Sequence, residues 1–389
     1  MLSRHRALVT AGAACLAALA VAGCSQSGSS KSSAVTISGN SLTIYISDPS
    51  SLSSDAAAQD VVDAERLAFS TQGSEVKGFK LSLYALHAEP SDNARAAIIN
   101  KNTIAYLGEI QPGVSDQTVG ITNALDVLQV SPTDNALELS QGTPAVSDAP
   151  KTFFESWGTY ARTFARVVPS AADEAKAQVA EMKSVGVSNL YIANDDSDYG
   201  RAIADAVRAD AHAAGITLAS SVSGAGGDFY GAESPSAAAK FFNHVATAAP
   251  AAKLFGPSSL NSSAFTSAIS ASVHNLYVSI PGFLPKDLPA EGKAFDTAFK
   301  AAYGHTPNVE AIFGYEAMSA VLRVLEREGT SANNRTSVVN GFLSQKKVPS
   351  VLGTYSIDSG GNTNLDAFVF ARMSGGKLVP FKAAPITQG

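Results

Sequence analysis

The stretch NLYIANDDSDYGRAIADAVRADAHAAGI, Asn189–Ile216, decides the fold of this sequence. Leu190–Ala193 is a short apolar run that predicts a buried strand, and the polar residues Asn194–Ser197 follow as a loop. An apolar residue then recurs every four positions, as on one face of a helix: Ile203, Val207 and Ala211. Gly215 suits the left-handed position that ends a helix, and Ile216–Val222 is a second apolar run. The pattern predicts one βαβ unit.

Crossover connections are right-handed, so the two strands of this unit should be parallel. Open parallel sheets bind ligands beyond the carboxyl ends of their strands. In this unit that end is Asn194–Gly200, which makes Asp195, Asp196 and Tyr199 the first candidate ligand contacts. A second interpretation remains open, in which the two aspartates cap the helix and the Tyr199 ring packs in the core.

Predicted strands and helices alternate along most of the chain. Strands are expected at 41–47, 79–84, 104–107, 127–130, 228–232, 253–256 and 276–280, and helices at 55–69, 94–100, 118–125, 172–185, 237–247, 289–303 and 312–328. Two strands, 354–357 and 367–373, end the pattern. This alternation indicates an α/β fold with doubly wound parallel sheets, and the similar rhythm of the two halves indicates two similar lobes.

Composition excludes several classes of function. The chain has 389 residues, a net charge of −6 and no cluster of basic residues, which argues against a nucleic-acid partner. The two cysteines, Cys15 and Cys24, both lie near the start, so the body has no disulfide, cysteine zinc site or cysteine nucleophile. The six histidines lack ligand spacing, and no catalytic motif occurs. We therefore expect a binding protein without metal or cofactor rather than an enzyme.

The first segment has the pattern of an export signal. Met1–Arg6 is basic, and the apolar run Ala7–Ala22 is too short for a spanning helix and suits a signal-peptide core. The core ends in Val21-Ala22-Gly23-Cys24, which resembles a bacterial lipobox, and this resemblance implies a diacylglycerol on Cys24. The alternatives are an ordinary signal with an unrelated cysteine and an uncleaved anchor helix. We expect a signal peptide over residues 1–23 and a lipidated flexible tether over 24–40.

Seven stretches resemble, in their order and spacing, the type I periplasmic binding proteins, and specifically the branched-chain amino-acid (Leu/Ile/Val) substrate-binding lipoproteins of ABC transporters. They are IAYLGEIQPGVS (Ile104–Ser115), VSPTDNALELS (Val130–Ser140), FARVVPS (Phe164–Ser170), DDSDYGRAIADAV (Asp195–Val207), LFGPSSL (Leu254–Leu260), AIFGYEAMSAVL (Ala311–Leu322) and VLGTYSIDSGGNT (Val351–Thr363). The resemblance implies two Rossmann-like lobes joined by three crossings, here near Thr163, Pro281 and Pro349. Lobe 1 would then be 41–162 plus 282–348, and lobe 2 would be 163–281 plus 349–389.

The resemblance also implies where an amino-acid ligand would sit between the lobes. Its carboxylate would meet Pro112 with Gly113, and Asn135 with the backbone of Thr133. Tyr199 precedes the glycine of a Tyr-Gly pair and would contact the ligand. The ligand's ammonium group would face position 258, which follows a Gly-Pro pair and is Ser258 in this chain.

Two of these positions depart from the family pattern. Pro112 offers neither a hydroxyl nor an N–H where the family has serine, and Ser258 has no charge where the family has an acid. A shortened segment before residue 236 would instead place Glu233 in the cleft, where it would replace the missing acid; the alternative is that Glu233 is exposed in a loop. Neutral hydrogen bonds would come from three further side chains: Gln111, Ser115 and Asn135.

The expectation is therefore an extracytoplasmic solute-binding lipoprotein of an ABC importer. It would capture a small polar or amphipathic solute, by default an amino acid, as a monomer held at the cell membrane by the lipid on Cys24, and deliver it to an ABC permease. Two alternatives remain open, a sensory or accessory ligand-binding lipoprotein without a transport role, and an enzyme on an α/β scaffold.

Overall fold

The computed structural model describes residues 35–154 and 162–384. The predicted signal peptide, the lipidation site Cys24 and residues 24–34 of the predicted tether lie outside the described residues. Among the helices that are described, none is long and apolar enough to cross a membrane.

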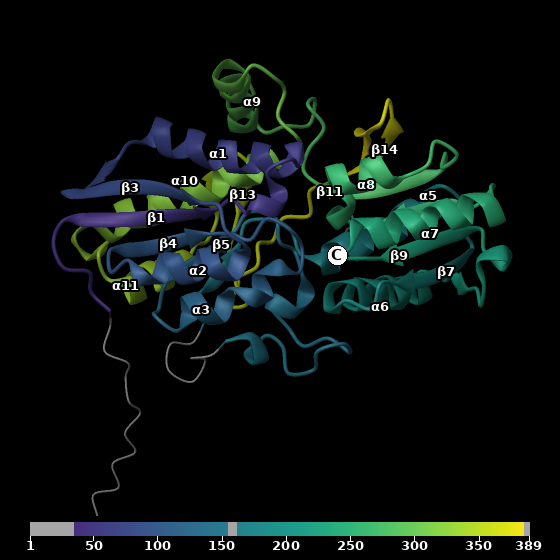
Figure 1. Ribbon diagram of the computed structural model, residues 1–389, viewed down its shortest axis with the longest axis horizontal. Helices are drawn as coiled ribbons and strands as arrows, with labels where there is room; N and C mark the ends of the chain where they lie inside the picture. The colour runs from purple at the N-terminus through teal and green to yellow at the C-terminus, as the bar shows by residue number, and fades with distance from the viewer. Residues whose placement is uncertain (1–34, 155–161, 385–389) are drawn as a thin grey trace, which may run out of the picture. The chain divides into compact units, whose positions relative to one another are not determined.

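The first lobe is built on a six-stranded sheet (Figure 1). The strand order is β2-β3-β1-β4-β5-β6, and every neighbouring pair is parallel except β2–β3. The strands are β1 (Ser41–Ser47), β2 (Glu75–Val76), β3 (Phe79–Leu86), β4 (Thr103–Leu107), β5 (Leu128–Ser131) and β6 (Phe164–Arg166). Its helices are α1 (Ala56–Gln72), α2 (Pro90–Ile99), α3 (Val119–Asn123), α9 (Ala290–Tyr303), α10 (Ala311–Glu328) and α11 (Arg335–Leu343).

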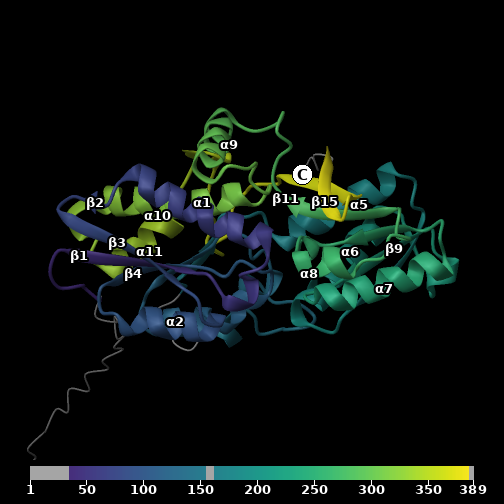
Figure 2. The same ribbon diagram turned by 45° about the horizontal axis from the view of Figure 1, so that its top comes forward.

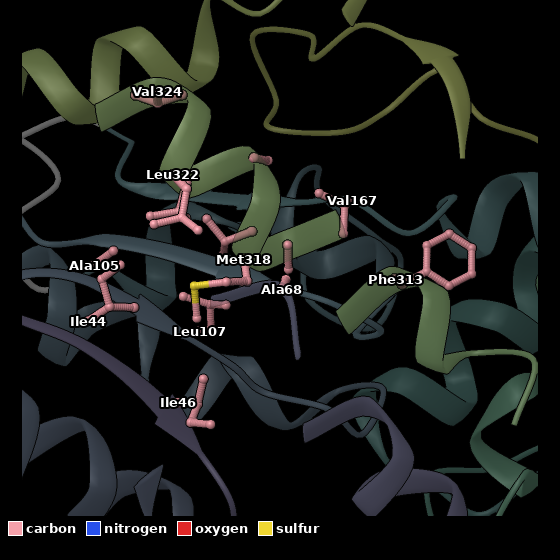
Figure 3. Packing of buried hydrophobic residues seen from close by; sticks show 14 of the residues in the cluster. Ile44, Ile46, Ala68, Ala105, Leu107, Val167, Phe313, Met318, Leu322 and Val324 are labelled. Carbon is pink, nitrogen blue, oxygen red and sulfur yellow. The ribbon is translucent and has the colours of Figure 1, made fainter. Parts of the chain in front are cut away.

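The core of this lobe forms where α1, α9, α10 and α11 pack on one face of the sheet. Figure 3 shows Ile44 and Ile46 of β1 and Leu107 of β4 beneath Met318 and Leu322 of α10. The two longest helices approach each other at Gly314, where an added Cβ would lie 2.2 Å from the carbonyl oxygen of Val61. Only glycine permits this approach of α10 to α1. Helices α2 and α3 cover the other face with a smaller cluster.

The second lobe is built on a seven-stranded sheet with the order β15-β14-β11-β10-β9-β7-β8. Its strands are β7 (Asn189–Asn194), β8 (Thr217–Leu218), β9 (Gly227–Gly231), β10 (Lys253–Gly256), β11 (Leu276–Pro281), β14 (Phe368–Ser374) and β15 (Lys377–Ala383). Helices α5 (Ala171–Ser184) and α6 (Asp198–Ala213) cover one face, and α7 (Pro235–Ala248) and α8 (Ser263–Ala268) cover the other. The strands from β7 to β11 are parallel, whereas β14 and β15 are antiparallel additions.

The βαβ unit predicted from Asn189–Ile216 is confirmed. β7, α6 and β8 follow one another, and β7 pairs with β8 in parallel. Gly215 has a φ of +77°, the left-handed conformation expected after the helix. The second strand is shorter than predicted, since β8 covers only Thr217–Leu218 rather than the whole of Ile216–Val222.

Three segments cross between the lobes, and two of them lie later in the chain than predicted. β6 pairs with β5, so the first crossing follows Arg166 instead of lying near Thr163. The second leaves β11 at Pro281. The third crossing was expected near Pro349, but a hairpin of β12 (Val348–Ser350) and β13 (Gly353–Tyr355) lies there. Residues 351, 352, 355 and 357 pack in the core of the first lobe. The third crossing therefore follows Ile357.

The crossings are hydrogen-bonded to one another and form the hinge. The N–H of Arg166 donates to the carbonyl of Gly361 at 2.9 Å, and the N–H of Gly282 donates to the carbonyl of Ala367 at 3.0 Å. The hydroxyl of Thr363 donates to the carbonyl of Val168 at 3.3 Å. Rotation of one lobe on the other would therefore bend three adjacent strands together.

Candidate functional site

The candidate site lies where the carboxyl ends of the two parallel sheets face each other. Loops that follow β4 and β5 come from the first lobe, and loops that follow β7, β9 and β10 come from the second. Such strand ends form the ligand-binding edge of open α/β sheets. The residues predicted from the sequence lie at this edge.

Gly113 brings the two lobes into contact. Its φ is +92°, and a Cβ added there would lie 3.1 Å from Cβ of Tyr199 and 3.3 Å from Oε2 of Glu233. Tyr199 begins the first turn of α6 and is fully buried, while Glu233 follows β9 and is half-buried. The side chain of Glu233 thus enters the region between the lobes, and the exposed-loop alternative does not describe its position.

Asp134 binds the backbone N–H of Gly113, one of the groups predicted to meet a ligand carboxylate. Its carboxylate is fully buried and accepts hydrogen bonds from the N–H groups of Gly113 and Ser115, both at 2.8 Å, and from that of Ala136 at 3.1 Å. Burial raises the pKa of Asp134, and the donors of Gly113, Ser115 and Ala136 lower it. Asp134 was not among the predicted site residues, although it stands between two of them, Thr133 and Asn135.

Asn135 joins the lobes through a second buried carboxylate, that of Glu174. Its amide Nδ2 donates to Oε2 of Glu174 at 2.6 Å and to Oγ of Ser258 at 3.2 Å. Glu174 lies in the first turn of α5 and accepts two further bonds from Ser258, through its N–H at 2.6 Å and its hydroxyl at 3.1 Å. Ser279 also donates to Glu174. Burial raises the pKa of Glu174, and these donors lower it. An acid therefore lies next to Ser258, where the sequence alone showed none.

Four of the other predicted residues have separate positions. Gln111, Pro112 and Ser258 line a small cavity. Its volume of about 30 Å³ has room for about one water molecule. The hydroxyl of Ser115 accepts the N–H of Glu109 at 3.0 Å. The hydroxyl of Thr133 donates to the carbonyl of Ile110. Ser115 and Thr133 therefore stabilise loops of the first lobe from within.

The two aspartates of the opening stretch make hydrogen bonds to neighbouring loops. Oδ1 of Asp195 accepts the N–H and the hydroxyl of Ser197, and Oδ2 accepts the N–H of Ser234 at 2.8 Å. Asp196 has a φ of +63°, and its carbonyl accepts a bond from Arg201 at 2.6 Å. Neither aspartate is the N-cap of α6, because that position is Ser197, whose side chain accepts the N–H of Gly200. The Tyr199 ring packs in a core cluster of the second lobe, and its Cβ lies beside Gly113 of the first lobe.

The surroundings of the site are acidic. Burial raises the pKa of Asp116 to about 7, with Asp134 and Glu233 raising it further. Burial also raises the pKa of Glu138 to about 8, with Asp134 and Asp116 adding to this and Arg166 lowering it. Burial raises the pKa of Glu233 as well, followed by the charges of Asp195, Asp134 and Asp198. A cationic group would be stabilised between these carboxyl groups.

A second pair of hydrogen-bonded contacts joins the lobes beside the small cavity. Nδ2 of Asn261, in the loop after β10, donates to Oε2 of Glu310 at 2.5 Å and to Oδ1 of Asn308 at 3.1 Å. Oδ2 of Asp55 accepts the N–H of Ser263 at 2.9 Å. Burial raises the pKa of Glu310 to about 8. The described lobes are thus closed on each other.

Several polar atoms at the interface have no hydrogen-bond partner among the described residues. They are Oδ1 of Asn135, Oδ1 of Asp116 and the hydroxyl of Tyr199. Burial raises the pKa of Tyr199 well above its usual value, with Glu174 as the next cause, so its hydroxyl stays protonated. Within residues 35–154 and 162–384, no group of three or more His, Cys, Asp or Glu side chains is placed to hold a metal ion.

Comparison with known proteins agrees with this geometry. Residues 221–377 match the periplasmic binding protein family. A comparison of the sequence with curated proteins gives no match.

Solved structures of solute-binding proteins share the fold. A leucine-binding protein of Thermotoga maritima superposes with a TM-score of 0.72 at 16% identity, covering 88% of this chain and 98% of its own. An ABC transporter substrate-binding protein of Desulfitobacterium hafniense in complex with Leu gives 0.69 at 20% identity, covering 88% and 100%. An ABC transporter solute-binding protein of R. palustris in complex with benzoate gives 0.66 at 17% identity, covering 89% and 97%. The body therefore has the fold that these proteins share, with two α/β lobes.

Proposed function

We propose, from the type I periplasmic binding protein fold of the body, that this chain is the extracytoplasmic solute-binding component of an ABC importer. The observation that supports this most is the contact of Gly113 with Tyr199 and Glu233, together with the bond from Asn135 to Ser258. These contacts join the ligand-binding edges of two sheets that share only a three-strand hinge. Surfaces of this kind part and close around a solute.

The polar atoms of the interface favour a ligand that donates hydrogen bonds. The N–H groups of Gly113 and Ser115 are already bonded to Asp134, whereas the unpartnered atoms include the acceptor oxygens of Asn135 and Asp116. The surrounding carboxyl groups favour a positive charge. An amino acid, whose ammonium group meets these conditions, is the default ligand, and an amine without a carboxylate meets them as well.

Glu233 is the proposed partner of the ligand's ammonium group. Glu174 beside Ser258 already accepts hydrogen bonds from Asn135, Ser258 and Ser279, whereas Oε2 of Glu233 lies beside Gly113 at the interface of the lobes. A buried ammonium without a carboxylate partner would be strongly unfavourable. Gln111, Asn135, Ser258 and the hydroxyl of Tyr199 would contribute the neutral part of the site.

Membrane attachment and delivery complete the proposal. The lipobox-like sequence at Cys24 supports a lipid anchor, which would hold a monomeric body near a permease in the membrane. Replacing Cys24 by Ser should release the protein from the membrane fraction and abolish its labelling by a radioactive fatty acid. Continued labelling would contradict lipidation at this position.

A ligand screen tests the binding function. The purified body is titrated by thermal shift and calorimetry with the twenty amino acids, their amides, short peptides and primary amines. A specific ligand at a hundred times its dissociation constant should stabilise the protein by about 2.7 kcal/mol. Stabilisation by none of these classes, or only by anions, would contradict the proposed ligand chemistry.

Two variants then test the role of Glu233. Glu233→Gln should weaken the ligand by about tenfold to a hundredfold, since a hydrogen bond to a charged group contributes about 1.5–3 kcal/mol. Glu75→Gln is the matched control, because Glu75 is exposed at the edge of the first sheet. Equal affinity in both variants would exclude Glu233 from the site.

A further inference from the structure

A large pocket opens beside the interface of the lobes and shares part of its lining, including Asp55 and Asn261, with the small cavity at Gln111 and Ser258. Its volume is about 930 Å³. The first lobe contributes the start of α1, helix α9 and residues 305–312, and the second contributes residues 261–266 and the turn between β14 and β15. Figure 2 shows α9 and β15 on the same side of the body. Of the predicted site residues, none lines this pocket.

The wall of the pocket is mostly apolar. Aliphatic and aromatic side chains from both lobes form it, including Ile280, Phe283, Leu288, Phe295, Ile312 and Leu378. Pockets of about 300–1,000 Å³ with such walls and a few polar groups are typical of sites for small organic molecules. The pocket has the size and the lining of a ligand site in its own right.

The charges on the lining are unbalanced. Four carboxyl groups line the pocket, those of Asp55, Asp60, Asp63 and Asp296, against the side chains of Lys377 and His305. One carboxyl oxygen of Asp63 forms an ion pair with Arg66, and one of Asp296 forms an ion pair with Lys300. Both oxygens of Asp55 accept backbone N–H groups. A cation rather than an anion complements this lining.

Asp60 is the acid best placed to receive that cation. Its Oδ2 accepts the N–H of Asn308 at 2.7 Å, while its Oδ1 lies 3.6 Å from Nε2 of His305, which is beyond hydrogen-bond length. The side chain is 11% exposed. One oxygen of this nearly buried carboxylate therefore accepts no hydrogen bond, although it forms an ion pair with His305 when the imidazole is protonated.

We propose that this pocket is a second binding site, for an amphipathic monocation with an aromatic or alkyl body and a primary ammonium group. The ammonium group meets Asp60, and the body lies against α9 and the β14–β15 turn. The site is separate from the one bounded by Gly113, Tyr199 and Glu233. Because the walls of the pocket belong to both lobes, the bound molecule contacts both lobes at once in the closed form.

Three isosteric probes test the proposal: 2-phenylethylammonium, 2-phenylethanol and 3-phenylpropanoate. Titration of the body is followed by ¹H–¹³C methyl spectra with assigned signals for Ile280, Ile312 and Leu288. We expect the ammonium probe to shift these signals in a saturable way, at least tenfold more tightly than the alcohol, and the propanoate to leave them unchanged. Equal binding of all three probes, or shifts confined to methyl groups outside the pocket, would overturn it.

Variants separate this site from the cleft. Asp60→Asn should weaken the binding of the ammonium probe about tenfold, and Leu378→Trp, which fills the pocket from the edge strand β15, should abolish it. Asp287→Asn, a nearby acid outside the lining, is the control and should change nothing. Glu233→Gln should leave the probe unaffected, so the two sites can fail independently. Retained affinity in both Asp60→Asn and Leu378→Trp would refute the site.

Discussion

Glu310 links the closure of the lobes to pH. It is 8% exposed, at the start of α10, and its carboxylate accepts the amide of Asn261 from the other lobe. Burial raises its pKa from 4.5 to about 8, with the charges of Glu174 and Asp55 adding to the rise and the bond from Asn261 lowering it. Its charged form is therefore less favourable in the closed structure than in water.

The sign of the effect follows from the raised pKa. The contribution of Glu310 to the stability of the folded, closed structure is fully present below pH 4.5, where its carboxyl group is protonated in both the folded and the unfolded state. This contribution is lost as the pH rises through about 8. The rise amounts to roughly 3.5 pH units, which corresponds to about 5 kcal/mol between the extremes at about 1.36 kcal/mol per unit. Opening of the lobes would expose Glu310 to water without unfolding the protein. The loss of stability at high pH therefore cannot exceed the free energy needed to open the lobes.

Two measurements follow this change. The body contains no cysteine, so Lys80→Cys in the first lobe and Lys240→Cys in the second allow a fluorescent pair to report the distance between the lobes. Urea unfolding gives the stability. From pH 5 to pH 8.5, we expect the parent protein to lose stability and the lobes to move apart.

Glu310→Gln keeps the shape of the side chain and the acceptor for Asn261 but has no charge to bury. We expect this variant to be less dependent on pH in both measurements, and more stable than the parent at pH 8.5. The same pH dependence in the parent and the variant would refute the role of Glu310.

Three further substitutions have defined outcomes. Gly314→Ala should destabilise the first lobe by about 1–3 kcal/mol or more in urea unfolding, because its Cβ would collide with the carbonyl of Val61; an unchanged midpoint would contradict this packing. Asp228→Asn should raise the melting temperature at pH 8.5 but not at pH 5. Burial raises the pKa of Asp228 to about 7, and neither carboxyl oxygen has a hydrogen-bond partner among the described residues. A gain at both pH values would refute this role of its charge. Gly113→Ala should cost about 1–2 kcal/mol and separate the lobes, because the residue has a φ of +92° and its Cβ would press on Tyr199; an unchanged fluorescent distance would exclude the contact.

Elements with strong periodicity could be predicted from the sequence. β1 matches its predicted range, and α10 differs from its prediction by one residue at its start. β15 was missed because Lys377–Ala383 contains Pro380, which argues against a strand. The structure tolerates this proline because β15 is the edge strand of its sheet. Its position depends on tertiary pairing that the local sequence does not show.

The candidate site was predicted in part for the same reason. Tyr199 and Glu233 could be placed near Gly113 because the family resemblance implies that the strand ends of the two lobes face each other across one cleft. Asp134 and Glu174 could not be assigned their contacts. An acid in the first turn of a helix, such as Glu174 in α5, usually interacts with that helix's own N-terminus. Only the packing of α5 against the loop after β10 directs it to Ser258.

The way the chain enters the body determines which lobe an anchor would hold. The N–H of Ile37 donates to the carbonyl of Asn333, and the N–H of Arg335 donates to the carbonyl of Val35, so the first described residues are fastened to the first lobe. The last described strand, β15, belongs to the second lobe. A pull exerted through the N-terminal chain would act on the first lobe alone and leave the second free to swing, so a surface-attached molecule should respond to its solute as readily as one in solution.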